Sequence, residues 1–284
     1  MDGFIFLDKQ IGVTSTSEGN AIKRLFNTKK VGHVGTLDPF ASGLLIIGVN
    51  KGTKAITFFD DFEKEYVTTI KLGIATDSMD LTGKEIERKE IPNLSIDKIN
   101  EVLQSFLGKN KQLPPMTSAV HVNGQKLYKL AHQGIEVDRP LRDIEIFEIE
   151  LLDFNSDEIT FRALVSKGTY IRVLGSDIAN RLGTVGHLNQ LRRTKVCPFD
   201  LSKSSKIEDV KETSVKSIYE VLKEFSEVVE YDEVKILDIK NGKVLEIKHS
   251  TNKNKLLVID KSHNAIAMYL KVRDNIFRFA RGLF

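Results

Sequence analysis

Apolar residues recur along this chain at two spacings, one typical of amphipathic helices and the other of strands. The clearest helical pattern covers residues 95–107, and Gly108 follows it at a stop position. Its apolar face consists of Ile96, Ile99, Val102, Leu103, Phe106 and Leu107. A second helix is predicted over residues 14–26, where Ser15 or Ser17 is available as the N-cap. Further helices are predicted at residues 53–59, 125–132, 171–182 and 214–225.

Strands are predicted where β-branched residues cluster or where apolar and polar residues alternate. These segments are residues 44–49, 65–75, 144–154 and 159–165. The acidic stretch Glu224–Glu233 is typical of a domain linker. After it, short strand-like runs follow at residues 234–239, 256–259, 265–272 and 276–279. The pattern therefore predicts a large domain over residues 1–228 and a small β-rich domain over residues 229–284.

The composition is that of an ordinary globular protein, with 41% hydrophobic and 29% charged residues among 284. The N-terminal segment is too short and too acidic for a signal peptide, and no apolar run approaches the ~20 residues that span a bilayer. Cys197 is the single cysteine, so an internal disulfide is excluded and a reducing compartment fits. We expect a cytoplasmic protein.

Positive charge gathers at the C-terminal end of the chain. The whole protein has a net charge of +3, but the segment from Tyr231 onward contains 11 Lys and Arg against 6 Asp and Glu. A basic tail on a near-neutral body fits a polyanionic partner, although a solvated lysine-rich surface gives the same count.

The densest cluster of special residues is the stretch 31–45, which precedes the apolar run of residues 44–49. It contains three glycines, His33, Asp38 and Pro39. Glycine permits positive φ and close approach, while Pro39 fixes its own φ and keeps Asp38 out of helical conformation. A tight turn with a solvated aspartate is the simpler interpretation. The density of Gly, His and Asp favours a rigid loop that holds Asp38 for chemistry.

This loop resembles the signature of the TruB-type tRNA pseudouridine synthases. The matching residues are Gly-His-Val-Gly-Thr-Leu-Asp-Pro at positions 32–39, and a second match is Ser-Lys-Gly-Thr-Tyr-Ile-Arg at positions 166–172. The resemblance extends over residues 4–200 and more weakly into the tail. Gln10 departs from it, because the family has proline there. The family fold is α+β, with a mixed, mainly antiparallel central sheet, a thumb-like insertion and a small C-terminal PUA-like domain.

The resemblance implies an RNA isomerase that converts the T-loop uridine at position 55 of tRNA into pseudouridine. Asp38 would attack a flipped-out nucleotide, and the uracil would leave through N1, rotate and rejoin through C5. The reaction consumes no water and needs no cofactor. A two-carboxylate glycosidase would need a second acid, for which Asp77 or Asp80 is available, but these are more typical of turn formers.

Other site residues follow from the same resemblance. Arg172 would pair with Asp38 and orient it, as a guanidinium can do with a carboxylate. Tyr66 would stack on the base, with a possible part in proton transfer, and Tyr170 and Leu191 would line the pocket. If residues 170–172 are extended, the side chains of Tyr170 and Arg172 point to one face. His33 would wedge into the T-loop.

No histidine stands at metal-ligand spacing, so we expect no metal site. Basic residues that could position RNA phosphates are Lys109, Lys111, Arg139, Arg142, Arg192, Arg193 and Lys195. The thumb-like insertion corresponds to residues 112–142 and would close on the T-arm stem-loop. We expect a monomer that acts on tRNA without a membrane or an obligate protein partner.

Two other functions fit the same residues. One is a non-catalytic RNA-binding protein or tRNA folding chaperone, for which Asp38 would be dispensable. The other is an aspartate-dependent N-glycosidase, which would release free uracil.

Overall fold

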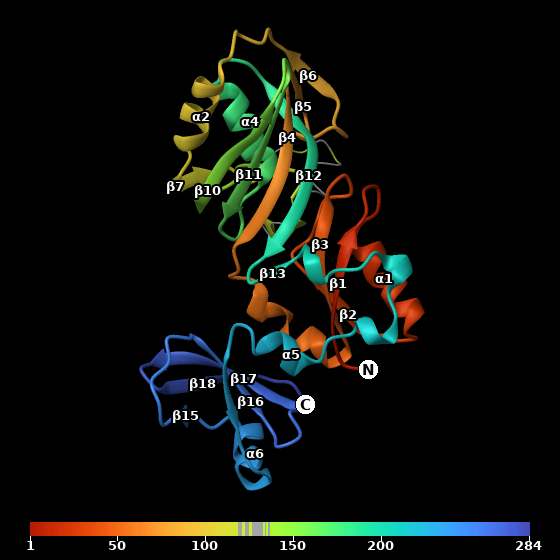
Figure 1. The fold of residues 1–284 in the computed structure, drawn as a ribbon, viewed down its shortest axis with the longest axis vertical. Coiled ribbons are helices and arrows are strands. Elements are labelled where there is room, and N and C mark those ends of the chain that lie inside the picture. Colours follow the sequence, from red (N-terminus) through yellow and green to blue (C-terminus); the bar gives the residue numbers. More distant parts are fainter. Residues whose placement is uncertain (119–120, 123–124, 127–132, 134, 136) are drawn as a thin grey trace. The chain divides into compact units, whose positions relative to one another are not determined.

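The computed structural model describes the chain except for residues 119–120, 123–124, 127–132, 134 and 136, and except for the side chains at 121, 122, 125 and 126. The described residues form two compact units. The first comprises residues 1–39, 43–60 and 198–284, and the second comprises residues 40–42 and 61–197. Figure 1 labels most of the helices and strands of both.

The first unit begins with an antiparallel sheet that carries the loop containing Asp38. Strand β3 (Ser42–Val49) pairs with β1 (Gly3–Lys9) and with β2 (Val31–Val34). The apolar side chains of β1 and β3 are almost fully buried, whichever face they point to. Because both faces of these strands are covered, their apolar residues are consecutive and do not alternate with polar residues as in a half-exposed strand.

Helices flank these strands in the sequence. Helix α1 (Ser15–Leu25) begins at Thr14, whose hydroxyl accepts from the backbone N–H of Ser17, while the Ser17 side chain accepts from the Thr14 N–H. The predicted N-cap at Ser15 or Ser17 was therefore wrong by one to three positions. The helix predicted at residues 53–59 is the 3₁₀ helix η1 (Asn50–Phe59).

A run of short turns leads from the second unit into the C-terminal sheet. It contains β13 (Phe199–Asp200), the 3₁₀ turns η2 (Leu201–Lys203), η3 (Ile207–Asp209) and η4 (Glu212–Ser214), and helix α5 (Ile218–Leu222). The helix predicted at residues 214–225 is thus much shorter than expected. Its start is marked by a capping box in which Ser217 and Glu220 bond each other's backbone N–H.

The C-terminal sheet has the strand order β14-β16-β17-β18-β15. Its strands are β14 (Glu227–Glu230), β15 (Leu245–Glu246), β16 (Lys255–Ile259), β17 (Ala265–Arg273) and β18 (Ile276–Gly282). Only β14 and β16 pair in parallel among these. The predicted linker at Glu224–Glu233 was wrong, since β14 lies within it. The small β-rich module itself is confirmed.

Residues 234–239 form a helix rather than the predicted strand. Helix α6 (Glu233–Lys240) is capped by Asp232, whose carboxylate accepts from the backbone N–H of Lys235. Ile236 and Ile239 are buried in the core beneath the sheet. Spacing of three places these two side chains on one helical face, which outweighs the strand propensity of the β-branched residues.

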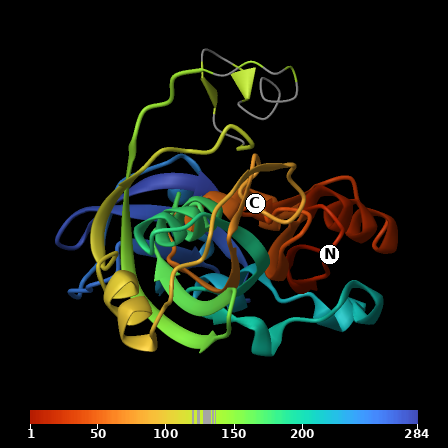
Figure 2. The same cartoon turned by 90° about the horizontal axis from the view of Figure 1, so that it is seen from above.

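The second unit is built on an antiparallel sheet in the order β12-β4-β11-β10-β7. Its strands are β4 (Lys64–Leu72), β7 (Gly108–Gln112), β10 (Arg142–Phe154), β11 (Glu158–Val165) and β12 (Gly186–Val196). Helices α2 (Ile96–Gln104) and α4 (Ile171–Arg181) pack on it and on each other. Figure 2 shows the yellow helix α2 beside the green strands. The predicted α+β fold with a mainly antiparallel central sheet is confirmed.

Close contact between α4 and the sheet depends on a glycine. A Cβ added at Gly175 would lie 2.5 Å from Leu188 Cδ2 and 3.4 Å from Ile70 Cγ1. Side chains larger than hydrogen would therefore push α4 away from β4 and β12. The face of the sheet that carries Ile70 and Leu188 is the one that α4 covers.

Two small hairpins complete the second unit. Strand β5 (Ile74–Thr76) pairs with β6 (Glu85–Arg88), and Gly73, with φ of +86°, separates β5 from the strand with which it was predicted to be continuous. Strand β8 (His121–Val122) pairs with β9 (Gln125–Lys126). The helix predicted at residues 125–132 therefore does not begin at Gln125, and its residues 127–132 lie outside the described part. No helix among the described residues is long and apolar enough to cross a membrane.

Candidate active site

Asp38 lies in the loop that joins β2 to β3. Its side chain is half-buried, while the side chain of Leu37 before it is only 3% exposed. Gly35 and Gly43, on either side of the loop, have φ of +59° and +104°, in the left-handed region that favours glycine. The apolar neighbour and the two glycines give Asp38 a defined and accessible position.

A buried lysine, Lys9, binds the loop on the C-terminal side of Asp38. Lys9 is 0% exposed, and its Nζ donates to the carbonyl oxygens of Gln10 at 3.0 Å, Val13 at 2.7 Å and Pro39 at 3.4 Å. The Pro39 carbonyl also accepts from the backbone N–H of Gly12 at 2.8 Å. The carbonyl group of Pro39, the residue directly after Asp38, is thereby tied to the end of β1.

His33 stands on β2, five residues before Asp38. Its side chain is half-buried, and its Nε2 lies 3.2 Å from Thr36 Oγ1. This contact holds the imidazole next to the loop. A role in opening the T-loop of tRNA stays a prediction.

Tyr66 and Leu191 share one face of the central sheet. Tyr66 and Thr68 are two residues apart on β4, so they point to the same side. Thr68 pairs with Leu191 of β12, and residues directly opposite in an antiparallel pair also share a side. Ile70 and Leu188 pair on this side too. The face is therefore the one that α4 covers, and Tyr66 and Leu191 are 8% and 7% exposed on it.

Tyr170 and Arg172 stand where α4 begins, as the helix predicted from residue 171 implied, so residues 170–172 are not one extended segment. Tyr170 is the N-cap residue, and Arg172 lies within the first helical turn. Arg172 is 4% exposed. Its guanidinium donates to the carbonyl oxygen of Ser78 at 3.0 Å, to Thr117 Oγ1 at 2.6 Å and to the Thr117 carbonyl oxygen at 3.1 Å.

Arg172 also faces a buried carboxylate that the sequence left open as a turn former. Asp80 Oδ2 lies 3.5 Å from the Arg172 guanidinium, and both side chains are 5% exposed. The other oxygen, Oδ1, accepts from Ser78 Oγ at 2.8 Å and from the backbone N–H and Oγ1 of Thr82 at 2.9 and 2.6 Å. Asp80 thus both forms the turn and contributes negative charge beside Arg172. Asp77 has only the turn role among its described contacts, accepting from the Lys84 N–H at 2.9 Å.

The candidate residues are divided between the two units. Tyr66, Tyr170, Arg172 and Leu191 belong to the second unit, on or beside the face covered by α4. Asp38 belongs to the first unit. The pairing of Asp38 with Arg172 therefore stays a prediction.

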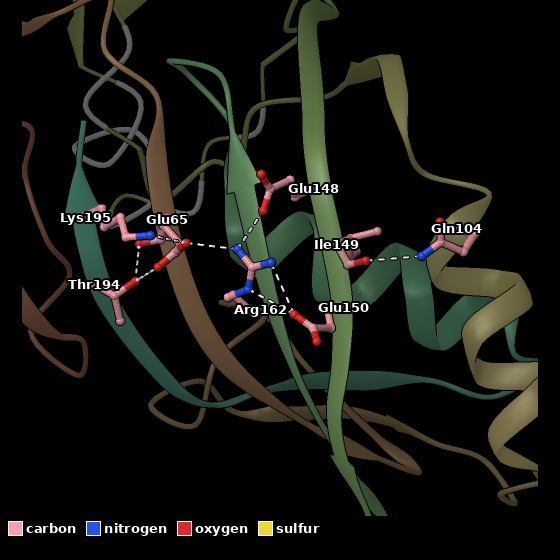
Figure 3. A network of polar contacts seen from close by, with 8 residues as sticks. All are labelled: Glu65, Gln104, Glu148, Ile149, Glu150, Arg162, Thr194 and Lys195. Carbon is pink, nitrogen blue, oxygen red and sulfur yellow. Dashed lines mark hydrogen bonds and ion pairs between the residues drawn. The ribbon is translucent and has the colours of Figure 1, made fainter. Parts of the chain in front are cut away.

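The opposite face of the central sheet carries charged residues, which Figure 3 shows. Arg162 of β11 donates to Glu65 at 2.9 Å, to Glu148 at 2.8 Å and to Glu150 at 3.1 Å. The hydrogen bond to Glu148 raises the pKa of the Arg162 guanidinium further, against the effect of its burial, with help from Glu65 and Glu150. Arg162 is therefore a fixed cation that joins three strands.

Glu65 connects this cation to β12. Its carboxylate accepts from Lys195 at 2.9 Å and from Thr194 Oγ1 at 2.8 Å as well as from Arg162. Burial acts to raise the pKa of the Glu65 carboxyl, but the three hydrogen bonds outweigh it and hold the pKa below its usual value. Glu65 directly precedes Tyr66 on β4, so this network fixes the strand at the position of Tyr66, the residue predicted to stack on the base.

The basic residues predicted to contact phosphate have different settings. Lys109 and Lys111 are exposed on the edge strand β7. Arg193 is 1% exposed, opposite Tyr66 in the strand register, and Lys195 is bound to Glu65. Arg193 is thus too buried to contact phosphate in this conformation, and that part of the prediction was wrong. Among the described residues, no group of three or more His, Cys, Asp or Glu is arranged to hold a metal ion.

Two family models match the chain. Residues 23–171 match the TruB family pseudouridylate synthase N-terminal domain, and residues 172–230 match the tRNA pseudouridylate synthase B C-terminal domain. The matched ranges contain all six candidate residues.

Curated relatives agree with this assignment. The tRNA pseudouridine synthase B of Geotalea uraniireducens (strain Rf4) is 44% identical over 209 residues, which are 74% of this chain and 67% of the relative. The tRNA pseudouridine synthase B of Francisella tularensis subsp. tularensis (strain WY96-3418) is 45% identical over 215 residues, 75% of this chain and 71% of the relative.

Solved structures with the same fold have lower sequence identity. One is described as a Cbf5-Nop10-Gar1 complex (TM-score 0.75, 23% identity), and another as an H/ACA RNP bound to a substrate RNA containing 2'-deoxyuridine (TM-score 0.74, 22% identity). Each comparison covers 99% of this chain and 85% of the other. At this level of identity they establish the fold alone.

Proposed function

The chain belongs to the TruB family of pseudouridylate synthases, and we propose that it converts the T-loop uridine at position 55 of tRNA into pseudouridine. The family makes it an RNA isomerase, as the resemblance at residues 32–39 implied. The observation that carries the proposal is the Asp38 loop, whose residues 32–39 resemble the family signature and lie within the matched range. Relatives named tRNA pseudouridine synthase B, at 44 and 45% identity, support tRNA as the substrate.

Asp38 is the nucleophile in this proposal. Its carboxylate forms a covalent bond to the target nucleotide while the bond between uracil N1 and the ribose C1′ breaks. The uracil turns, and C5 bonds to C1′ as the bond between Asp38 and the nucleotide breaks, which frees the carboxylate. C5 then loses a proton, and N1 gains one. Substrate and product are isomers, so no water, oxidant or group donor enters the balance. The half-buried position of Asp38 in a braced loop supports this role.

The residues of the second unit bind the flipped base and orient the carboxylate that attacks the nucleotide. Tyr66 stacks on the uracil and is a candidate for proton transfer, while Tyr170 and Leu191 line the pocket. Arg172 orients the Asp38 carboxylate. The shared face of Tyr66 and Leu191, and the position of Tyr170 and Arg172 at the start of the helix on that face, support one pocket for these four residues.

The RNA contacts extend beyond the target nucleotide. His33 wedges into the T-loop, and the thumb-like insertion at residues 112–142 closes on the T-arm. The C-terminal residues 229–284 act as a short PUA-like RNA-binding domain, which their net positive charge supports. We further propose that the enzyme works in the cytoplasm as a monomer, without a cofactor.

Incubation with an unmodified tRNA transcript tests the proposal. Pseudouridine should form at position 55, and no free uracil should appear. Free uracil would instead support an N-glycosidase, and tight tRNA binding without any product would support a chaperone.

The Asp38→Asn variant tests the nucleophile. It removes the negative charge but keeps the shape, so it should form no pseudouridine and should bind tRNA within about threefold of the parent protein. Product formation at the parental rate would exclude Asp38 as the nucleophile. Loss of binding would show that Asp38 acts in recognition rather than only in chemistry.

A further inference from the structure

Gln112 stands where the chain leaves the central sheet. It is the last residue of β7, and its backbone pairs with Arg142, the first residue of β10. These two residues therefore close the base of the segment proposed as the thumb-like insertion. The side chain of Gln112 is 3% exposed and points inward rather than toward solvent.

The amide group of Gln112 binds the backbone of Tyr170 at two points. Its Oε1 accepts from the Tyr170 N–H at 2.8 Å, and its Nε2 donates to the Tyr170 carbonyl oxygen at 3.0 Å. The N–H belongs to the peptide plane before the Tyr170 Cα and the carbonyl to the plane after it. Two bonds from one planar amide therefore fix both planes, and with them the direction of the Tyr170 side chain.

Tyr170 depends on this support because of its place in the fold. It is the N-cap of α4, with φ of −95° and ψ of 108°, and its own side chain makes no capping bond. Its carbonyl begins the helical ladder by accepting from the Leu174 N–H at 3.1 Å, but an N-cap N–H has no partner within the helix. Gln112 supplies the partner for that N–H.

The same stretch also reaches the second residue of the site. Five positions after Gln112, Thr117 binds the Arg172 guanidinium through both its hydroxyl and its carbonyl oxygen. The first residues of the insertion thus contact both Tyr170 and Arg172.

We propose that Gln112 is a positioning residue, which holds Tyr170 in the orientation needed to receive the flipped base. Gln112 does not touch the substrate; it acts through the backbone of Tyr170. The inference rests on the proposed function, because it assumes that Tyr170 lines the pocket. It adds that the base of the insertion and the pocket wall are joined by one buried amide.

Gln112→Met tests the inference, because it keeps the length and apolar volume of the side chain and removes both hydrogen bonds. The single-turnover rate of pseudouridine formation should fall about 10- to 100-fold, the cost of misplacing a group around a bound substrate. The Kd for tRNA should change less than threefold, since phosphate contacts elsewhere dominate binding. Gln112→Glu keeps the acceptor for the Tyr170 N–H but loses the donor to its carbonyl oxygen. Its single-turnover rate should therefore lie between those of Gln112→Met and the parent protein.

Gln104→Met is the matched control. Gln104 also gives one backbone hydrogen bond within this unit, to the Ile149 carbonyl oxygen at 3.2 Å, but it has no described contact with Tyr170 (Figure 3). Its rate should match that of the parent protein. A Gln112→Met rate equal to that of Gln104→Met would overturn the inference.

A double-mutant cycle with Tyr170→Ala separates positioning from a general loss of structure. If Gln112 acts through Tyr170, Gln112→Met should lower the rate less than twofold once the tyrosine ring is absent. Equal losses in both backgrounds would overturn the inference. If Gln112→Met does not fold, the same cycle is run with Gln112→Glu, and additive losses there overturn it too. An inactive parent protein would instead refute the proposed function.

Discussion

Ser15 and Leu37 exchange two hydrogen bonds across 22 positions of sequence. Ser15 Oγ accepts from the Leu37 N–H at 2.9 Å and donates to the Leu37 carbonyl oxygen at 3.1 Å. Ser15 is 1% exposed, so these bonds form away from water. Leu37 directly precedes Asp38, and Lys9 binds the carbonyl of the residue directly after it. The nucleophile candidate is therefore held on both sides by buried polar groups from residues 9–15.

Ser15→Ala should weaken both the fold and the reaction. The buried N–H and carbonyl of Leu37 lose their partner, which costs about 1–3 kcal/mol of unfolding free energy. The freed loop should also lower the rate of pseudouridine formation about 10-fold, because Asp38 is no longer held in place. Urea denaturation and single-turnover kinetics measure the two effects.

Ser17→Ala is the comparison for this prediction. It removes the hydrogen bond that the Ser17 side chain accepts from the Thr14 N–H, at about 0.5–1.5 kcal/mol, and leaves both the N-cap bond from Thr14 and the contacts of Leu37 in place. Its rate should stay within twofold of the parent protein under conditions where both are folded. Equal rates for the two variants would show that the bonds from Ser15 to Leu37 do not affect the reaction.

Asp80→Asn should impair the reaction while the turn remains. The asparagine Oδ1 can still accept from Ser78 and Thr82, but the negative charge 3.5 Å from Arg172 is lost. Without the Asp80 carboxylate, the Arg172 guanidinium loses an ion-pair partner, which disturbs the orientation in which we propose that it binds Asp38. We expect the single-turnover rate to fall about 10-fold or more, with little change in unfolding free energy.

Asp77→Asn is the matched variant, since Asp77 lies in the same turn and accepts only from the Lys84 N–H among its described contacts. It should react at the parental rate. A slow Asp77→Asn variant would mean that the turn itself, rather than the charge beside Arg172, limits the reaction.

Some of this molecule could be predicted from its sequence. The helices at residues 15–25, 96–104 and 171–181 and the strands β3, β4, β10 and β11 follow from local periodicity, because each buries one face or both. Strands β7 and β12 of the central sheet were not predicted. Asp38 was predicted as a site residue because a carboxylate, a histidine and glycines cluster in one loop. These signals are contained in short segments.

Other features could not be predicted, because they depend on contacts between distant segments. The bonds from Ser15 to Leu37 and from Gln112 to Tyr170 span 22 and 58 positions, and no local pattern marks them. Residues 234–239 were predicted as a strand because β-branched residues favour one. The core that buries Ile236 and Ile239 on one helical face is known only from the fold.

Gln10→Pro should destabilise the protein even though proline is the family residue there. Burial raises the pKa of the Glu18 carboxyl, while Lys9 and a hydrogen bond from the Gln10 backbone lower it. Proline has no N–H, so the buried carboxylate would lose that bond, at about 1–3 kcal/mol. The gain from a stiffer unfolded chain, about 0.4–1 kcal/mol, is smaller.

Gln10→Ala controls for the side chain. It keeps the N–H and removes only the amide bond to the Asp8 carbonyl oxygen at 3.1 Å. Urea denaturation should place it within about 0.5 kcal/mol of the parent protein. A Gln10→Pro variant more stable than the parent would show that the Gln10 N–H does not support Glu18.

Glu65→Gln should make stability less dependent on pH in acid. The pKa of Glu65 lies below 4.5 in the folded protein, so its ionised form stabilises the fold above pH 4.5. That contribution is lost as the pH falls through the folded-state pKa, where both states become protonated. At pH 7 the variant should be about 1–3 kcal/mol less stable than the parent protein, since three hydrogen bonds to a charged group are weakened. Toward about pH 3, the difference should shrink.

Glu150→Gln provides the contrast, because Glu150 also binds Arg162 but its side chain is 57% exposed. Exposed ion pairs contribute about 0–1 kcal/mol, so this variant should differ little from the parent protein at either pH. Unfolding free energies of all three proteins at pH 7 and at about pH 3 decide the matter. The difference in unfolding free energy between Glu65→Gln and the parent protein should not stay constant over this range. A constant difference would mean that ionisation of the Glu65 carboxyl does not stabilise the fold.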